Sequence, residues 1–187
     1  MGAPHNKDRY GEVANQIRID CCLWELEYIK DYIVLSGGWA WHFMSPEGHV
    51  ELKHAHDHKD IDIFIEPKYV GAVVSVLKSR GFEKVWTRYD GKPLKIGDEF
   101  RRYEKVVEFP PEQEIRPVRI TIDFFVGTVE TRLLDSGWTV VKPEVLLTYY
   151  SSIHSSDACF AVQAASKLVA QGIDPVGRPE LVEIPNA

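Results

Sequence analysis

Two segments of the sequence alternate branched apolar residues with aspartate, and this pattern constrains the fold more than any other feature of the chain. In the first segment, "DIDIFI" at 60–65, isoleucine occupies every second position. Alternate residues of a β-strand share one face, so the isoleucines share one face and Asp60, Asp62 and Phe64 share the other. An unpaired carboxylate is costly in a protein core. We therefore expect a strand with one core face and one face that carries two carboxylates about 6 to 7 Å apart at their backbones.

The second segment, "RITIDFFV" at 119–126, repeats the pattern and places Asp123 opposite its core-facing isoleucines. If the two strands are neighbours, Asp60, Asp62 and Asp123 converge. Carboxylates about 5 Å apart repel by roughly 3 kcal/mol per pair at an effective dielectric constant near 20, and a divalent cation removes that repulsion. Oxygen ligands suit Mg²⁺ or Mn²⁺, and two such ions can hold the attacking and leaving oxygens of a phosphoryl displacement. The alternative is that each aspartate lies on the solvated face of an edge strand.

A glycine turn precedes both segments. "LSGGWA" at 35–40 follows an apolar stretch that resembles a short strand and precedes a segment with helical character. Gly37 and Gly38 allow backbone N–H groups and a helix N-terminus to approach phosphate oxygens, and the Ser36 hydroxyl is a further donor. Two adjacent glycines often form only a tight turn. The order of strand, Ser-Gly-Gly, helix, Asp-x-Asp strand and later Asp strand is much more specific.

The remaining patterns predict an α/β (α+β) fold, in which helices flank a mixed β-sheet and further helices follow at the C-terminal end. A chain of 187 residues is expected to form one domain, 1–187, with a core at about 33–155. The predicted helices are an N-terminal one at about 9–31, others at 39–44 and 68–80, and a C-terminal helical segment at about 143–171. The predicted strands lie at 32–36, 60–66, 100–109 and 118–126, with two further β-type runs around the turn pair Asp90-Gly91.

Charge and cysteine content limit the partners and the compartment. The net charge of −6 argues against binding of long nucleic acid or of an anionic membrane through bulk charge. No apolar run reaches the length of a signal-peptide core or a membrane span. Cys21, Cys22 and Cys159 form neither a disulfide framework nor a zinc pattern, which favours a reducing compartment. We therefore expect a cytoplasmic protein.

Together, "LSGGWA", "KDIDIFI" and "ITIDFFV" resemble the nucleotidyltransferase superfamily with the DNA polymerase β-like fold, and in particular its small members, similar to aminoglycoside and lincosamide nucleotidyltransferases. The resemblance covers about residues 33–155. It implies transfer of a nucleoside monophosphate group from a nucleoside triphosphate to an acceptor hydroxyl or phosphate, with release of pyrophosphate. It also implies binding of ATP or a related nucleotide, and two Mg²⁺ or Mn²⁺ ions. The residues implied are Asp60, Asp62 and Asp123 for metal and catalysis, and Ser36, Gly37, Gly38 and Lys59 for the nucleotide.

The chain departs from the antibiotic-modifying relatives in several places, two of which lie next to the motifs. It has His42 where they carry an aspartate after "GGWA", and "HAHDHK" where they carry an arginine before the aspartate pair. The resemblance therefore implies the fold and the metal site rather than their antibiotic substrates. His42, His56 and His58 are secondary site candidates, because neutral imidazole binds zinc or nickel and protonated imidazole binds phosphate. A solvated loop is the alternative for the histidine-rich segment.

Other side chains and other functions fit the same sequence. Basic residues near the Asp90-Gly91 turn could bind the triphosphate or an anionic acceptor, or form an exposed charged hairpin; they are Arg88, Lys92, Lys95, Arg101 and Arg102. The expected partners are a nucleoside triphosphate and a small-molecule or short acceptor. The alternative function is an antitoxin-like binding module of the same fold that acts through a protein partner, and a histidine-rich metal-binding protein is a third.

Overall fold

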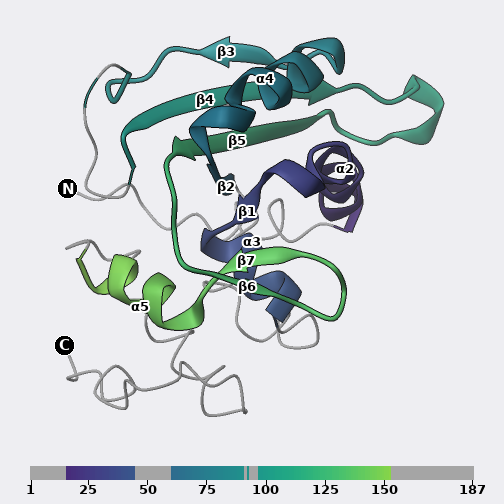
Figure 1. The fold of residues 1–187 in the computed structure, drawn as a ribbon. Helices are drawn as coiled ribbons and strands as arrows, with labels where there is room; N and C mark the ends of the chain where they lie inside the picture. The colour runs from purple at the N-terminus through teal and green to yellow at the C-terminus, as the bar shows by residue number, and fades with distance from the viewer. Residues whose placement is uncertain (1–15, 45–59, 91, 93–96, 153–187) are drawn as a thin grey trace, which may run out of the picture.

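A seven-stranded mixed sheet forms the centre of the protein in the computed structural model, which describes residues 16–44, 60–90, 92 and 97–152 (Figure 1). The strand order is β3-β4-β5-β2-β1-β7-β6. The strands are β1 (Val34–Leu35), β2 (Ile61–Ile65), β3 (Glu83–Val85), β4 (Glu99–Val107), β5 (Val118–Val126), β6 (Thr131–Leu133) and β7 (Thr139–Val141). The helices are α2 (Gln16–Glu27), α3 (Gly37–Met44), α4 (Val70–Ser79) and α5 (Pro143–Ser152), with short 3-10 turns at Lys30–Tyr32, Pro67–Tyr69 and Pro111–Gln113.

The prediction of a mixed sheet flanked by helices is confirmed. Strand β5 pairs in parallel with β2 and antiparallel with β4, and β1 pairs antiparallel with β2 but in parallel with β7. The glycine turn leads directly from β1 into α3, as expected. Helix α4 ends at Ser79, close to the predicted end at residue 80, and the φ of +83° at Gly81 suits a glycine after a helix.

The structure differs from the sequence-based expectations at several element boundaries. The N-terminal helix ends at Glu27 rather than near residue 31, and a 3-10 turn follows it. Strands β6 and β7 were not predicted, because each has only three residues and β6 is exposed along its length. The second arm of the hairpin at 93–96 and the C-terminal helix expected at 155–171 lie outside the described residues.

The two faces of the sheet have different coverings. The core-facing side chains of β2 and β5 are almost fully buried, with Ile61, Ile63, Ile120 and Ile122 at most 1% exposed. Helices α2 and α4 supply the buried side chains of the same core cluster, including Leu26 and Leu77. Burial of a large aliphatic side chain contributes about 1.5–3 kcal/mol, so this face provides much of the stability. The opposite face is left for the aspartates, and Tyr149 of α5 stacks on Phe64 there at 6.1 Å between ring centroids.

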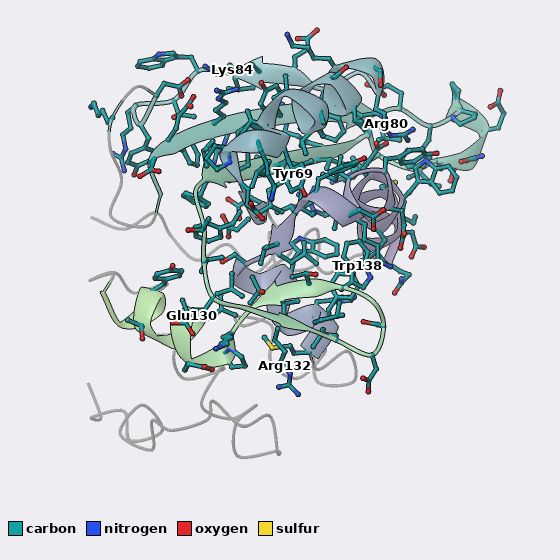
Figure 2. All side chains as sticks on the ribbon, viewed as in Figure 1. Tyr69, Arg80, Lys84, Glu130, Arg132 and Trp138 are labelled. Carbon is teal, nitrogen blue, oxygen red and sulfur yellow. The ribbon has the colours of Figure 1, made fainter. Side chains whose placement is uncertain are left out.

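A buried ion cluster joins α2 and the C-terminal end of α4 to the core face of the sheet. The Glu25 side chain is 3% exposed and accepts hydrogen bonds from Arg80, at 2.5 and 3.2 Å, and from Lys105 of β4, at 2.6 Å (Figure 2 marks Arg80). Burial alone would raise the pKa of Glu25, but the hydrogen bonds from Arg80 and Lys105 outweigh it and hold the pKa below its usual value. Glu25 is therefore a carboxylate in the folded protein at neutral pH.

Two further observations concern the length of the helices and the cysteines. Within the described ranges, no helix combines the length and the apolar character that a membrane crossing requires. Cys22 is fully buried, which raises the pKa of its thiol to about 12, and Cys21 is only partly exposed. Both belong to α2, where Cys22 is part of the core cluster and Cys21 packs against it, whereas Cys159 lies outside the described residues.

Replacing Glu25 by glutamine should lower the free energy of unfolding by about 2 kcal/mol at pH 7, because Arg80 and Lys105 would lose their charged acceptor. The pKa of Glu25 is lower in the folded than in the unfolded protein, so its stabilisation is complete above the unfolded pKa of about 4.3 and is lost as pH falls through the folded pKa. Urea denaturation from pH 7 to pH 3 should therefore show the difference between wild type and Glu25→Gln shrinking at the acid end.

Glu27→Gln is the matched control in the same helix. Glu27 is 56% exposed and lies 3.7 Å from Lys30, so its loss should cost under about 0.5 kcal/mol. Equal costs at the two positions would contradict a special role for the buried cluster.

Candidate functional site

The parallel pairing of β2 with β5 brings two of the three predicted aspartates side by side. Asp62 and Asp123 are register partners, and so are the residues before and after them along both strands. Register partners on neighbouring strands project to the same face, about 5 Å apart. Asp60 immediately precedes β2 and lies on the same face by strand alternation. The structure thus brings Asp60, Asp62 and Asp123 together on the face opposite the main core.

The glycine turn lies directly against one of these carboxylates. The Ser36 N–H donates a 2.8 Å hydrogen bond to the Asp62 carbonyl, and the Ser36 carbonyl accepts one from the Ala40 N–H at 3.1 Å, which begins α3. Gly37 has a φ of +56°, a conformation that favours glycine. A Cβ at Gly37 would lie 3.1 Å from Cγ of Asp62 and still closer to Oδ2. The missing side chain is therefore what gives the Asp62 carboxylate its place beside the first turn of α3.

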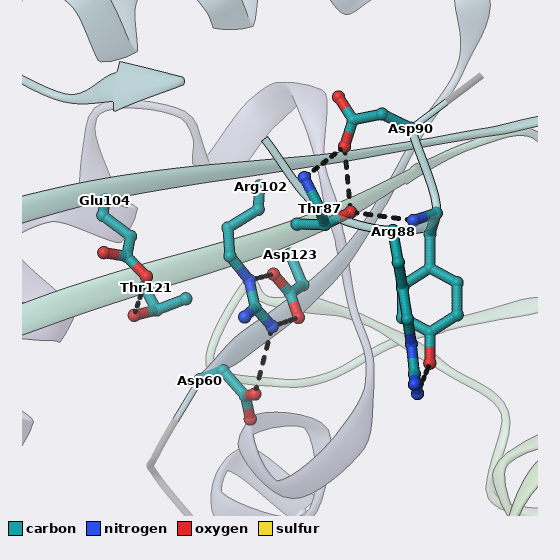
Figure 3. A network of polar contacts seen from close by, with 9 residues as sticks. Asp60, Thr87, Arg88, Asp90, Arg102, Glu104, Thr121 and Asp123 are labelled. Atoms are coloured by element: carbon teal, nitrogen blue, oxygen red, sulfur yellow. Dashed lines mark hydrogen bonds and ion pairs between the residues drawn. The ribbon is translucent and has the colours of Figure 1, made fainter. Parts of the chain in front are cut away.

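Arg102 of β4 adds a cation that the sequence did not predict at this position. It is the register partner of Asp123, and its guanidinium donates to both carboxylate oxygens, Nε to Oδ1 at 2.6 Å and Nη2 to Oδ2 at 2.5 Å (Figure 3). The same Nη2 lies 3.8 Å from Oδ2 of Asp60. The hydrogen bonds to Asp123 raise the pKa of Arg102, so the guanidinium is charged at every accessible pH. Asp123 is the most buried partner, with its side chain 8% exposed.

The donor set suits a divalent metal in its chemistry, although one ligand is engaged by Arg102. Three carboxylates from adjacent strands provide the oxygen ligands that Mg²⁺ prefers, and the glycine bend leaves room for Asp62. The Arg102 guanidinium is a stand-in cation between two of these carboxylates. In this conformation, no group of three His, Cys, Asp or Glu side chains in the described part of the chain is arranged to hold a metal ion. Metal binding therefore requires the contacts of Arg102 to change.

The other predicted site residues are distributed differently. Ser36 is buried at the start of α3, and Gly38 follows Gly37 within the first turn. His42 lies in α3, with its ring 5.4 Å from that of Trp39 and 5.2 Å from that of Phe43. Lys59, His56 and His58 lie outside the described residues, so their roles stay predictions.

The basic residues near the turn do not act as one group. Arg101 pairs with Glu99 at 2.5 Å and lies over the Phe124 ring at 5.6 Å, on the core-facing side of β4. Arg102 points to the opposite side, into the aspartate cluster. Arg88 donates to the hydroxyl of its neighbour Tyr89. Only Arg102 among these three lies at the candidate site, and Lys95 is outside the described residues.

An aromatic row continues the same face of the sheet beyond the aspartates. Phe64 and Phe125 are register partners two residues beyond Asp62 and Asp123, with ring centroids 5.4 Å apart. Phe100 extends the row on β4, and Tyr149 of α5 stacks on Phe64. Burial raises the pKa of the Tyr149 hydroxyl. The row was not predicted, because strand alternation gives the face of a residue but not its neighbours on other strands.

Gly37→Ala should lower the free energy of unfolding by at least about 1–2 kcal/mol, since an alanine there would adopt a left-handed conformation and its Cβ would collide with Asp62. Gly71→Ala in α4 is the matched control. Its Cβ would meet nothing within 4 Å, so it should stabilise the helix by about 0.5 kcal/mol. Urea denaturation measures both, and a Gly37→Ala variant as stable as wild type would contradict the close approach described above.

Comparison with known proteins gives similarity at the level of structure. No family model matches the chain, and no curated protein sequence matches it either. A protein from H. pylori, provisionally described as a nucleotidyltransferase, superposes with a TM-score of 0.50 at 11% identity, over 87% of this chain and 69% of its own. The polyadenylate synthase of Megavirus matches with a TM-score of 0.36 at 10% identity, over 92% of this chain.

The two matches differ in weight. This chain spans 32% of the length of the Megavirus protein, and that TM-score is too low to support an argument. The match to the H. pylori protein supports the fold alone, because the sequences share little identity. It agrees with the resemblance found in the sequence motifs. The chain therefore has a fold similar to that of the H. pylori protein.

Proposed function

We propose that the protein is a metal-dependent nucleotidyltransferase, which transfers a nucleoside monophosphate group from a nucleoside triphosphate to an acceptor hydroxyl or phosphate. In this reaction an acceptor oxygen attacks the α-phosphorus and forms a new P–O bond. The bond from the α-phosphorus to the bridging oxygen breaks, and pyrophosphate leaves with the electron pair. A proton from an acceptor hydroxyl passes to a carboxylate of the site or to water.

One observation carries the proposal: Asp62 lies beside Asp123 through the register of β2 with β5, and it also lies against the glycine bend that opens α3. Backbone N–H groups at a helix N-terminus bind phosphate oxygens, and a cluster of carboxylates next to them binds the ions that accompany phosphate. Either feature alone would be weak support. Their direct contact supports a site for a metal–triphosphate complex.

The roles of the residues follow from their positions. Asp60, Asp62 and Asp123 would hold one or two Mg²⁺ or Mn²⁺ ions, which when bound neutralise the charge that develops on the phosphoryl oxygens. Ser36, Gly37 and Gly38 would orient the triphosphate through hydroxyl and backbone donors. The aromatic row next to the aspartates offers an apolar surface for a base or for a small or short acceptor. Positioning and electrostatic stabilisation would supply most of the acceleration.

A second candidate is a binding module of the same fold that acts through a protein partner. The observation that favours it is the bidentate pairing of Asp123 with Arg102, which neutralises a carboxylate that catalysis needs. Such a module would bind neither metal nor nucleotide and would copurify with its partner. Metal and nucleotide binding therefore separate the two functions.

The proposal predicts that wild-type protein releases pyrophosphate from at least one of the four common nucleoside triphosphates when Mg²⁺ or Mn²⁺ and an acceptor are present. Asp60→Asn and Asp62→Asn should each reduce the rate by at least about 100-fold, because each loses a charged ligand with little change in shape. A coupled pyrophosphate assay measures the rates, and mass spectrometry of the acceptor detects the added nucleotidyl mass.

Asp98→Asn provides the control, since Asp98 is exposed just before β4 and its backbone N–H pairs with Val126, three residues beyond Asp123 on β5. It should retain wild-type activity. Circular dichroism of all variants checks that the fold is intact. Equal rates for wild type, Asp60→Asn and Asp62→Asn would remove the mechanism.

A further inference from the structure

The guanidinium of Arg102 occupies the space between two carboxylates of the candidate site. Its Nη2 is 2.5 Å from Oδ2 of Asp123 and 3.8 Å from Oδ2 of Asp60 (Figure 3). A cation shared by these two carboxylates would lie in the same region, because Mg²⁺ ligands lie at only about 2.1 Å. The nitrogen of Arg102 therefore lies where such an ion would bind.

This placement is built into the sheet. Arg102 and Asp123 are register partners on β4 and β5, so their backbones keep the two side chains within reach of each other. Nε and Nη2 of Arg102 each donate a hydrogen bond to one oxygen of the Asp123 carboxylate, and this bidentate geometry is the strongest for such a pair. Asp123 is largely shielded from water, whereas the side chain of Arg102 is 31% exposed. Arg102 can therefore move into solvent, but Asp123 cannot.

Two cations cannot share this space at low cost. A divalent ion close to Asp123 would repel the nearby guanidinium strongly, because the site is partly shielded from water. Conversely, the three carboxylates repel one another when no cation lies among them. The cluster is therefore stabilised by either the guanidinium or a metal ion, and the two compete for Asp123.

We propose that Arg102 is an internal competitor of the divalent metal, which it keeps from Asp123 until a metal–triphosphate complex arrives, and that the displaced guanidinium then pairs with the triphosphate. The inference rests on the proposed function for the identity of the ligands. Guanidinium binds phosphate in the same two-pronged manner as carboxylate. The first turn of α3 borders the same cluster through Asp62, so a phosphate held there would lie on the face to which Arg102 projects.

The competition has opposite consequences for the two ligands. A metal ion alone must displace Arg102. The apparent affinity for the metal is therefore the intrinsic affinity multiplied by the fraction of molecules in which the guanidinium has withdrawn. The metal–nucleotide complex regains an ion pair with the displaced side chain. Removing Arg102 should thus strengthen binding of metal alone and weaken binding of nucleotide in the presence of metal. A purely structural role for Arg102 would weaken both.

The test measures Mn²⁺ binding without turnover, by electron paramagnetic resonance of free Mn²⁺ in titrations of wild type, Arg102→Gln and Arg101→Gln. Arg101→Gln is a matched control, since it removes the same charge from the neighbouring residue of β4, whose side chain pairs with Glu99 on the other face. Arg102→Gln should bind Mn²⁺ at least about tenfold more tightly than wild type, and Arg101→Gln within about twofold of it. Arg102→Lys keeps the charge but not the forked geometry of guanidinium, so its Mn²⁺ affinity should lie between those of wild type and Arg102→Gln. This variant replaces Arg102→Gln in the test if Arg102→Gln does not fold.

A second titration measures binding of a non-hydrolysable ATP analogue with Mg²⁺ present, and here Arg102→Gln should bind about tenfold more weakly than wild type. The inference is overturned if wild type and Arg102→Gln bind Mn²⁺ equally, if Arg102→Gln binds it more weakly, or if neither binds it. Its failure differs from failure of the proposed function. If pyrophosphate release depends on Asp60 but wild type and Arg102→Gln bind Mn²⁺ equally, the proposed function stands and the inference about Arg102 is wrong. If Arg102→Gln binds Mn²⁺ more tightly and the analogue more weakly, but the protein releases no pyrophosphate from any triphosphate, the inference about Arg102 stands and the proposed function is wrong.

Discussion

The register between β2 and β5 is the constraint on which the rest of the site depends. Parallel pairing sets Asp62 opposite Asp123, and the antiparallel pairing of β5 with β4 sets Arg102 on the other side of the same carboxylate. A shift of one residue in either pairing would turn the side chains of that strand to the core face. The isoleucines oppose such a shift, because it would expose them and bury the charges. Packing of the apolar face therefore fixes the geometry of the polar face.

The two faces of the sheet each hold a buried carboxylate, and the cations that neutralise these carboxylates are arranged differently. Glu25, on the core face, has two cations of its own, Arg80 and Lys105, and its interactions are satisfied within the fold. Asp123, on the other face, pairs with the guanidinium of Arg102, which also lies near Asp60. In the first arrangement the ion pairs connect α2 and the end of α4 to β4. The second couples carboxylates at the start of β2 and in β5 to a side chain of β4 that is partly exposed.

The sequence predicts those features that depend on neighbours along the chain. Alternation within 60–65 gives the face of each aspartate, and the glycine pair gives the bend before α3. It does not predict the pairing of Arg102 with Asp123, because those residues belong to strands whose register is set by tertiary packing. Strands β6 and β7 were missed for a related reason. Three residues are too few to show a period, and their pairing with each other stabilises them.

The order of strands in the sheet also determines when the site can exist during synthesis. Asp62 meets its partner Asp123 only after β5 has left the ribosome, and β1, which carries the glycine bend, lies between β2 and a strand, β7, that comes later still. A nascent chain that ends before β5 therefore has its first two aspartates without the third. Contacts of such high sequence separation close slowly, because the entropy of the intervening loop is lost before the contacts form. The polar centre is thus among the late features of folding, assembled after the local helices and not before them.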